Sequence, residues 1–208
     1  MGNTLDPDFL AWEYTLAARS DFLWSLASLP LVRAADSLWK RSEAARTLWD
    51  GIVTGDKESP LLAQASFSGE ETEILNDYAL DRVALMLLGL ATENAAKTLI
   101  VRAQNETIVD DAKLHLKTHD LCWLLNEAGV QISAEEANQL VIIRDYVEWL
   151  GRYPVPLSAQ GKSGPRSVEG AWVMQRLGDA RQTWTAVRAV LERTIAKRDA
   201  IMFGVQAV

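Results

Sequence analysis

The side chains best suited to chemistry are an arginine and a histidine on separate predicted helices. Arg144 carries a guanidinium that can hold a phosphate or a carboxylate. His119 can move a proton near neutral pH. His115 stands four residues before it, a spacing that two metal ligands on one helix can have. Thr118 or Asp120 resembles a helix cap, and a helix that begins there would not run through both histidines. We therefore expect no metal site and no cofactor.

A second polar set lies just beyond an apolar run. Glu93 and Lys97 are four residues apart, in the order that favours pairing on a helix. We therefore expect a helix-stabilising ion pair. If the pair is buried, each charge must be satisfied by the other or by a partner, which would make the two residues elements of specificity.

The surroundings of Arg144 leave two interpretations open. Glu148 follows one helical turn later, and pairing between the two is the commoner outcome. Alternatively, Arg144 lies at the lip of a crevice. Arg152 and Tyr153 follow in a stiff segment that contains two prolines. They either end the helix or offer a cation and a phenol to a ligand.

These residues need a helical scaffold, and the sequence predicts one. The 208 residues, 49% of them hydrophobic, are enough for a single packed domain. Apolar residues recur at helical spacing, and no strand alternation is evident. We expect an all-α helical bundle with long central and C-terminal helices. Its parts are an N-terminal helical pair at 1–56, a core at 70–156 and a C-terminal helix at 166–205.

Local signals mark where the predicted helices begin and end. Pro30 should interrupt the N-terminal pair, because proline restricts the residue before it. The segment 83–91 is apolar nearly all round, so its helix should be central in a bundle or lie at the seam of a dimer. Ser133 and Glu136 predict a capping box at the start of the helix that carries Arg144.

Composition and charge indicate which binding partners and which cellular compartment to expect. The formal charge of −7 repels phosphate backbones, which makes DNA an unlikely partner. Cys122 is the sole cysteine, so the chain can form no intrachain disulfide; we read it as a small packing residue in a reducing compartment. The first eight residues carry no signal-peptide pattern, and the apolar run at 83–91 is too short to span a bilayer. We expect a cytoplasmic protein without membrane contact.

The block from about 78 to 156 resembles a HEPN domain, a helical module of four to five helices. Three segments, one from each of three predicted helices, carry the likeness. They are Glu93 with Lys97 in the long helix, the run Thr118-His119-Asp120-Leu121, and Arg144 with the closing run Trp149-Leu150-Gly151-Arg152-Tyr153-Pro154.

This resemblance implies a homodimer that works in a prokaryotic toxin–antitoxin, stress or phage-defence setting. Many HEPN proteins are metal-independent ribonucleases, and others only bind. The active members carry an arginine, four to six residues, and then a histidine. Counted from Arg144, that histidine would fall at 149, 150 or 151, where this chain has Trp, Leu and Gly. None of these can transfer a proton near neutral pH.

We therefore expect a divergent member that lacks the arginine–histidine motif. The first hypothesis is a non-catalytic module that binds a partner protein or RNA. The second is a divergent ribonuclease that uses Arg144 with His119 or Tyr153, and the third is a purely structural helical protein. The candidate ligand-binding residues are Arg144, Arg152, Tyr153, His119 and Asp120.

Overall fold

The computed structural model describes residues 20–53, 77, 80–104, 116, 118–147 and 180–204, except for the side chains of 49–53 and 104. Within these ranges the chain forms five helices and no strand, which confirms the all-α bundle. The helices are α2 (Asp21–Val53), α4 (Leu80–Gln104), α5 (Leu121–Glu127), α6 (Ala134–Asp145) and α8 (Ala180–Phe203).

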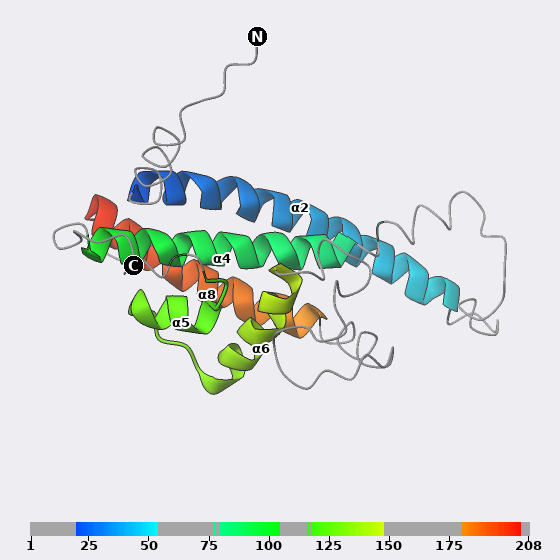
Figure 1. Ribbon diagram of the computed structural model, residues 1–208. Helices are drawn as coiled ribbons and strands as arrows, with labels where there is room; N and C mark the ends of the chain where they lie inside the picture. The colour runs from blue at the N-terminus through cyan, green and yellow to red at the C-terminus, as the bar shows by residue number, and fades with distance from the viewer. Residues whose placement is uncertain are drawn as a thin grey trace, which may run out of the picture.

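The two longest helices lie side by side in opposite directions (Figure 1). At one end of the pair, Arg102 of α4 reaches Asp21 of α2, with 3.1 Å between Nη1 and Oδ2. At the other end, Arg46 of α2 reaches Asp81 of α4, with 3.0 Å between Nη2 and Oδ2. The antiparallel pair therefore carries ion pairs near both of its ends.

Helix α8 completes the long layer, antiparallel to α2 and parallel to α4. The rings of Trp39 and Trp184 stack with centroids 4.5 Å apart and planes 2° apart. Further along, Arg198 Nη1 donates to Ser28 Oγ at 3.1 Å. The order of these contacts fixes the opposite directions of α2 and α8.

Helix α4 is the central helix of the bundle, one of the two positions that the sequence predicts for it. It contacts each of the other four described helices. Ala84, Leu85, Leu88 and Ala91 are fully buried along it. By length and composition its residues Leu80–Ala103 could cross a membrane, but 72% of the most apolar window is buried in the bundle, as in a core helix.

The short helices α5 and α6 cover the side of α4 that α2 leaves open. Gly89 of α4 sets the distance to α6. A methyl group added at Gly89 would lie 2.5 Å from Val147 Cγ2 and 2.6 Å from Ile143 Cγ2, well inside contact distance. Only a residue without Cβ allows this approach. Leu140 and Ile143 of α6, and Val147 just after it, are buried.

The predicted break at Pro30 is wrong, because α2 runs through it without interruption. Proline removes one backbone donor and thus frees one carbonyl, one turn earlier. Both Pro30 and that position, Leu26, are exposed, so water can bond the freed carbonyl. The opposite face of α2, with Ser28, Val32 and Ala35, is buried and keeps the helix together.

The predicted starts of the two short helices are confirmed. Asp120 caps α5, since its Oδ1 accepts from the backbone N–H of Trp123 at 3.0 Å. Ser133 and Glu136 form a reciprocal capping box on α6. Between these helices, Gly129 has a φ of 64°, the left-handed conformation that glycine adopts without strain. The predictions for residues 1–19, 54–76, 105–115 (with His115) and 148–179 fall outside the described residues.

Candidate functional site

Glu93 is a buried carboxylate that joins two basic side chains. It is 4% exposed in the middle of α4. Its Oε1 lies 2.5 Å from Lys97 Nζ, and its Oε2 lies 2.8 Å from His119 Nδ1. The pairing that the sequence predicts for Glu93 and Lys97 is confirmed. The same carboxylate also reaches a histidine 26 positions away in the chain.

Lys97 is enclosed by both α4 and α2. The residue is 3% exposed, and its Nζ lies 5.0 Å from the ring centroid of Trp24. An ammonium over an aromatic face is attracted by the ring electrons, an interaction that strengthens without water. The charge of Lys97 is thus satisfied by a carboxylate on one side and an indole on another.

His119 connects the buried pair of Glu93 and Lys97 to the surface. Its side chain is 44% exposed, and it lies immediately before α5. The backbone around it is fixed, because Thr118 Oγ1 accepts from the N–H of Asp120 at 3.0 Å and Asp120 caps α5. An ionised carboxylate only accepts hydrogen bonds, so with Glu93 in that form Nδ1 carries the proton.

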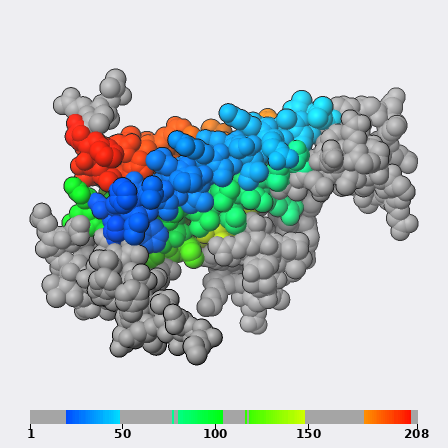
Figure 2. Space-filling model, turned by 90° about the horizontal axis from the view of Figure 1, so that it is seen from above, coloured from blue at the N-terminus to red at the C-terminus, as the bar shows by residue number. Residues whose placement is uncertain are grey.

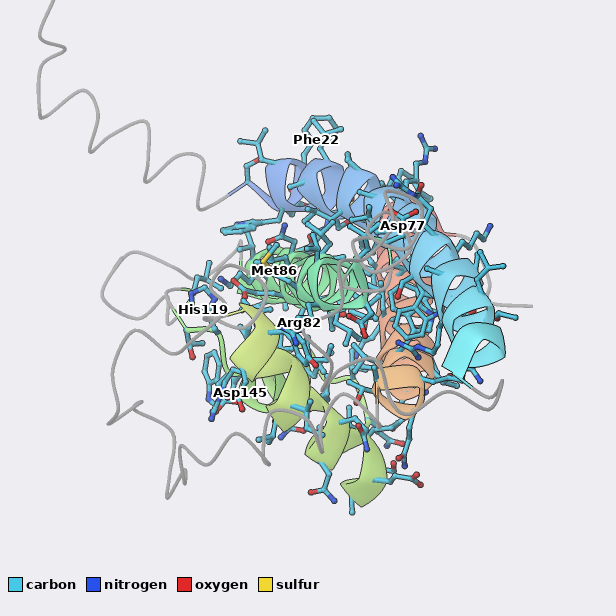
Figure 3. The ribbon with its side chains drawn as sticks, turned by 90° about the vertical axis from the view of Figure 1, so that its right-hand side faces the viewer. Phe22, Asp77, Arg82, Met86, His119 and Asp145 are labelled. Atoms are coloured by element: carbon cyan, nitrogen blue, oxygen red, sulfur yellow. The ribbon has the colours of Figure 1, made fainter. Side chains whose placement is uncertain are left out.

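The His119 side chain does not cap α5. The cap is Asp120, and the His119 ring bonds across to Glu93 of α4. Figure 3, a view along the bundle, shows His119 at the side of α4 opposite to α8. The ring is therefore partly exposed on the side of α4 away from α8, and does not lie in the seam of the long helices.

Arg144 approaches this edge from α6. Its Nη1 lies 3.9 Å from Asp120 Oδ2, and its side chain is partly buried. The structure thus brings Arg144 to the residue that follows His119. Glu148 lies outside the described residues, so its predicted pairing with Arg144 stays a prediction. Arg152 and Tyr153 also lie outside them.

We name this set of side chains the polar corner. It joins the central helix, the start of α5 and the end of α6, and its charges alternate in sign. Its members are Glu93, Lys97, His119, Asp120 and Arg144.

Cys122 lies close to the polar corner without the properties of a nucleophile. Burial raises the pKa of its thiol, and the Asp120 carboxylate raises it further, against the opposing effect of Arg144. Its Sγ donates to the carbonyl of Ala137 at 3.7 Å. The thiolate is the reactive form, so a raised pKa makes this cysteine a weaker nucleophile.

The polar corner can do two kinds of chemistry. A histidine with one ring nitrogen fixed on a carboxylate can exchange a proton through the other nitrogen. The same fixed ring, with a neighbouring carboxylate and guanidinium, can also bind complementary polar groups. Among the described residues, no group of three or more His, Cys, Asp or Glu side chains could hold a metal ion.

Sequence reasoning found the members of this site but not their connections. It treated Glu93 with Lys97 as one pair and His119 as a separate residue. It did not connect Trp24, from a helix about 70 positions earlier, with Lys97. The available signal was the carboxylate itself, because a buried Glu needs partners for both of its oxygens.

Comparison of the chain with models of protein families, with curated proteins and with solved structures finds no match.

Proposed function

We propose that this protein is a divergent HEPN-like interaction module that binds a partner without catalysis, and that the polar corner is the contact surface. The observation that supports this is the convergence of three segments distant in sequence. Glu93 with Lys97, the run from Thr118 to Leu121, and Arg144 carry the resemblance, and they meet at one edge of the bundle.

The charges at the polar corner favour a protein partner over RNA. Glu93 already neutralises Lys97 and holds His119, and Arg144 faces the Asp120 carboxylate. A phosphate would have to enter beside two carboxylates, on a chain with a formal charge of −7. Alternating charges suit a partner with complementary polar side chains, because they give specificity and orientation.

Photo-crosslinking tests this surface directly. Val141 is exposed on α6, one turn before Arg144, and accepts a photoreactive side chain there. Leu48, exposed on α2, is the matched control. We expect a defined protein adduct from position 141 and none from 48. The adduct should fall about tenfold or more with Arg144→Ala, as for a residue central to an interface. Equal adducts from both positions would contradict the proposal.

A divergent ribonuclease is the second candidate, because His119 lies next to the residue that Arg144 approaches. In the family that the chain resembles, the RNA's own 2′-hydroxyl is the nucleophile. The assay is incubation of the purified protein with structured and unstructured RNA in the presence of EDTA. We expect no cleavage. Cleavage that disappears in both Arg144→Ala and His119→Ala would replace the binding role with this one.

The remaining parts of this proposal come from the resemblance and from composition. They are a homodimeric assembly, a place in the cytoplasm of a prokaryote, and a role in stress, toxin–antitoxin or phage-defence systems.

A further inference from the structure

The short helix α5 carries one side of the polar corner. His119 and Asp120 stand directly before it, and the helix itself is only seven residues long. So short a helix is marginal in water without tertiary contacts. The position of His119 therefore depends on what holds the two ends of α5.

Apolar contacts hold α5 against α4 but do not set its direction. Leu121, Leu124 and Leu125 are buried, and α5 contacts α4. Burial of apolar area is non-directional, so it opposes separation of the two helices more strongly than a small tilt. A fixed direction requires hydrogen bonds at two separate points, and the bond from His119 to Glu93 supplies one of them.

The second point lies at the other end of α5. The N–H of Val130 donates to the carbonyl of Leu125 at 2.8 Å, the bond that closes a Schellman turn around Gly129. The carbonyls of Ala128 and Gly129 both accept from Lys197 Nζ of α8, at 2.9 and 2.6 Å. The end of α5 is thus bonded to a helix 68 positions further along the chain.

Lys197 suits this position in charge and in shape. A cation is favoured at the C-terminal end of a helix, where the carbonyls carry partial negative charge. A Cβ at Gly129 would lie 2.8 Å from Lys197 Nζ, so the lack of a side chain there admits the ammonium. The glycine therefore serves both the turn and the contact with α8.

The part of α8 that presents Lys197 is itself held in place. Arg198, the next residue, is 4% exposed, and its Nη1 donates to Ser28 Oγ of α2 at 3.1 Å. Figure 2 shows α8, in orange and red, lying along α2, in blue and cyan. Adjacent residues of α8 thus bond α2 and the end of α5, so Lys197 ties α5 to the layer of long helices.

We propose that Lys197 is a positioning residue for the polar corner, which it holds in place from the far end of α5. One fixed point of α5 is the bond from His119 to Glu93, and the other is the bond from Lys197. They lie roughly 15 Å apart, from the rise per residue between positions 119 and 129. Together they set the direction of α5 and hence the place of His119. The inference rests on the proposed function only for what the polar corner binds.

Hydrogen exchange of the full chain tests the positioning, with a matched pair of variants. Lys197→Met keeps an apolar side chain and removes the ammonium. Arg181→Met is the control, because it removes another cation of α8, one that pairs with α2. We expect the amide of Trp123, which donates to the Asp120 carboxylate, to exchange about tenfold faster in Lys197→Met and at the native rate in the control. Faster exchange confined to residues 128–130, or equal rates in the two variants, would overturn the proposal.

Nitrogen NMR of His119 gives a readout that a general loss of stability would not change. In the native chain we expect the neutral ring to carry its proton on Nδ1, toward Glu93. Lys197→Met should lower the ratio of this tautomer to the other about threefold, and Lys197→Arg should restore it, because a guanidinium can also donate to two carbonyls. A native ratio in Lys197→Met, or no recovery in Lys197→Arg, would contradict the proposal.

A further variant disturbs the same contact and leaves Lys197 unchanged. Asparagine enters the left-handed conformation more readily than most residues with a side chain, so Gly129→Asn keeps the turn. Its Cβ would lie 2.8 Å from Lys197 Nζ and displace the ammonium. We expect the same changes at Trp123 and His119, and no further change when Gly129→Asn is combined with Lys197→Met, because both remove one contact. Additive changes would show that the turn and the lysine act independently, against the proposal.

The photo-crosslink from position 141 separates this inference from the proposed function. An adduct that depends on Arg144, in a chain whose His119 tautomer does not respond to Lys197→Met, refutes the positioning role alone. A response of His119 in a chain that gives no adduct refutes the contact surface alone. Where both hold, Lys197→Met should lower the yield of the adduct about threefold, because fewer molecules keep the polar corner in its binding geometry. An undiminished adduct would contradict the role of Lys197 in recognition.

Discussion

Two buried ion pairs lie on the same central helix and differ in what completes them. Near the start of α4, Asp81 pairs with Arg46 of α2, whose guanidinium also lies 5.8 Å from the Trp39 ring centroid. Further along, Glu93 pairs within its own helix with Lys97 and reaches out to His119. The first pair fastens two long helices. The second pairs its two charges within one helix, with the Trp24 ring of α2 beside the lysine, and joins them to a partly exposed histidine.

The cost of burial differs between the two pairs. Desolvation raises the pKa of Asp81 in spite of the nearby Arg46, which lowers it less. Around Glu93, both carboxylate oxygens contact basic groups at 2.8 Å or less. A charge that serves only to join helices could be replaced by an apolar contact. A charge that also holds an exposed ring cannot be replaced in this way without releasing the ring, and for this reason we propose the polar corner as the contact surface.

The largest expected effect comes from breaking the polar corner. Glu93→Ala leaves the ammonium of Lys97 buried with only the Trp24 ring beside it. We expect a loss of about 3–5 kcal/mol in the free energy of unfolding, measured by urea denaturation. The double variant Glu93→Leu with Lys97→Met is the control and should recover most of the loss, because no charge remains buried. A loss below about 1 kcal/mol in the single variant would show that Lys97 reaches water.

The apolar contact between the two ion pairs gives the next effect. Gly89→Ala places a methyl group against the side chains of Ile143 and Val147. Alanine favours a helix over glycine by about 1 kcal/mol, but overpacking costs about 1–3 kcal/mol. We expect a net loss of about 1 kcal/mol and a lower thermal midpoint, with Ile143→Val in the Gly89→Ala background partly restoring it. A gain in stability would mean that α6 can move away freely.

The sign of a pH dependence sharpens the comparison at Asp81. Its raised pKa means that the Asp81 carboxyl group holds its proton more tightly in the folded protein than in the unfolded chain. The contribution of Asp81 to stability is therefore greatest below 3.8 and declines as pH rises from there through the folded-state pKa. We expect the free energy of unfolding of the native chain, minus that of Asp81→Asn, to fall as pH rises across this range. A difference that grows with pH would show that Arg46 outweighs desolvation.

The smallest expected effect is at Glu136, where the pH dependence of stability has the opposite sign to that at Asp81. The backbone N–H of Ser133 lowers the pKa of Glu136, with a further contribution from Arg193. This carboxylate stabilises the fold above 4.5, and the stabilisation is lost as pH falls through its lowered pKa. Glu136→Gln should cost about 0.5 kcal/mol near neutral pH, because its partner Arg193 is exposed and the ion pair is screened by water. In thermal denaturation, the stability difference between the native chain and Glu136→Gln should vanish in acid. A difference that stays constant with pH would show that packing, and not charge, causes it.

The fold was predictable where the signals are local. The capping box at Ser133 and the Asp120 cap depend on residues three apart, and the apolar run at 83–91 requires burial whatever its neighbours are. The continuous helix through Pro30 was not predictable from local rules. It depends on the packing of Val32 and Ala35 against other helices, which offsets the lost hydrogen bond.

The candidate site was predictable as residues but not as an arrangement. Helical spacing was enough to pair Glu93 with Lys97. No spacing rule connects Glu93 to His119, because the connection depends on how α5 packs against α4. The stacking of Trp39 on Trp184 is likewise a tertiary contact, across 145 positions of the chain.

The central claim is that Glu93 joins a buried lysine to an exposed histidine, and nitrogen NMR of the imidazole rings tests it most directly. The chain has two histidines, so a His115→Gln variant assigns the His119 signals. We expect a protonated Nδ1 and a free Nε2 in the neutral ring of the native protein, and a loss of that tautomer preference in Glu93→Gln. Identical tautomer populations in the two proteins would contradict the account.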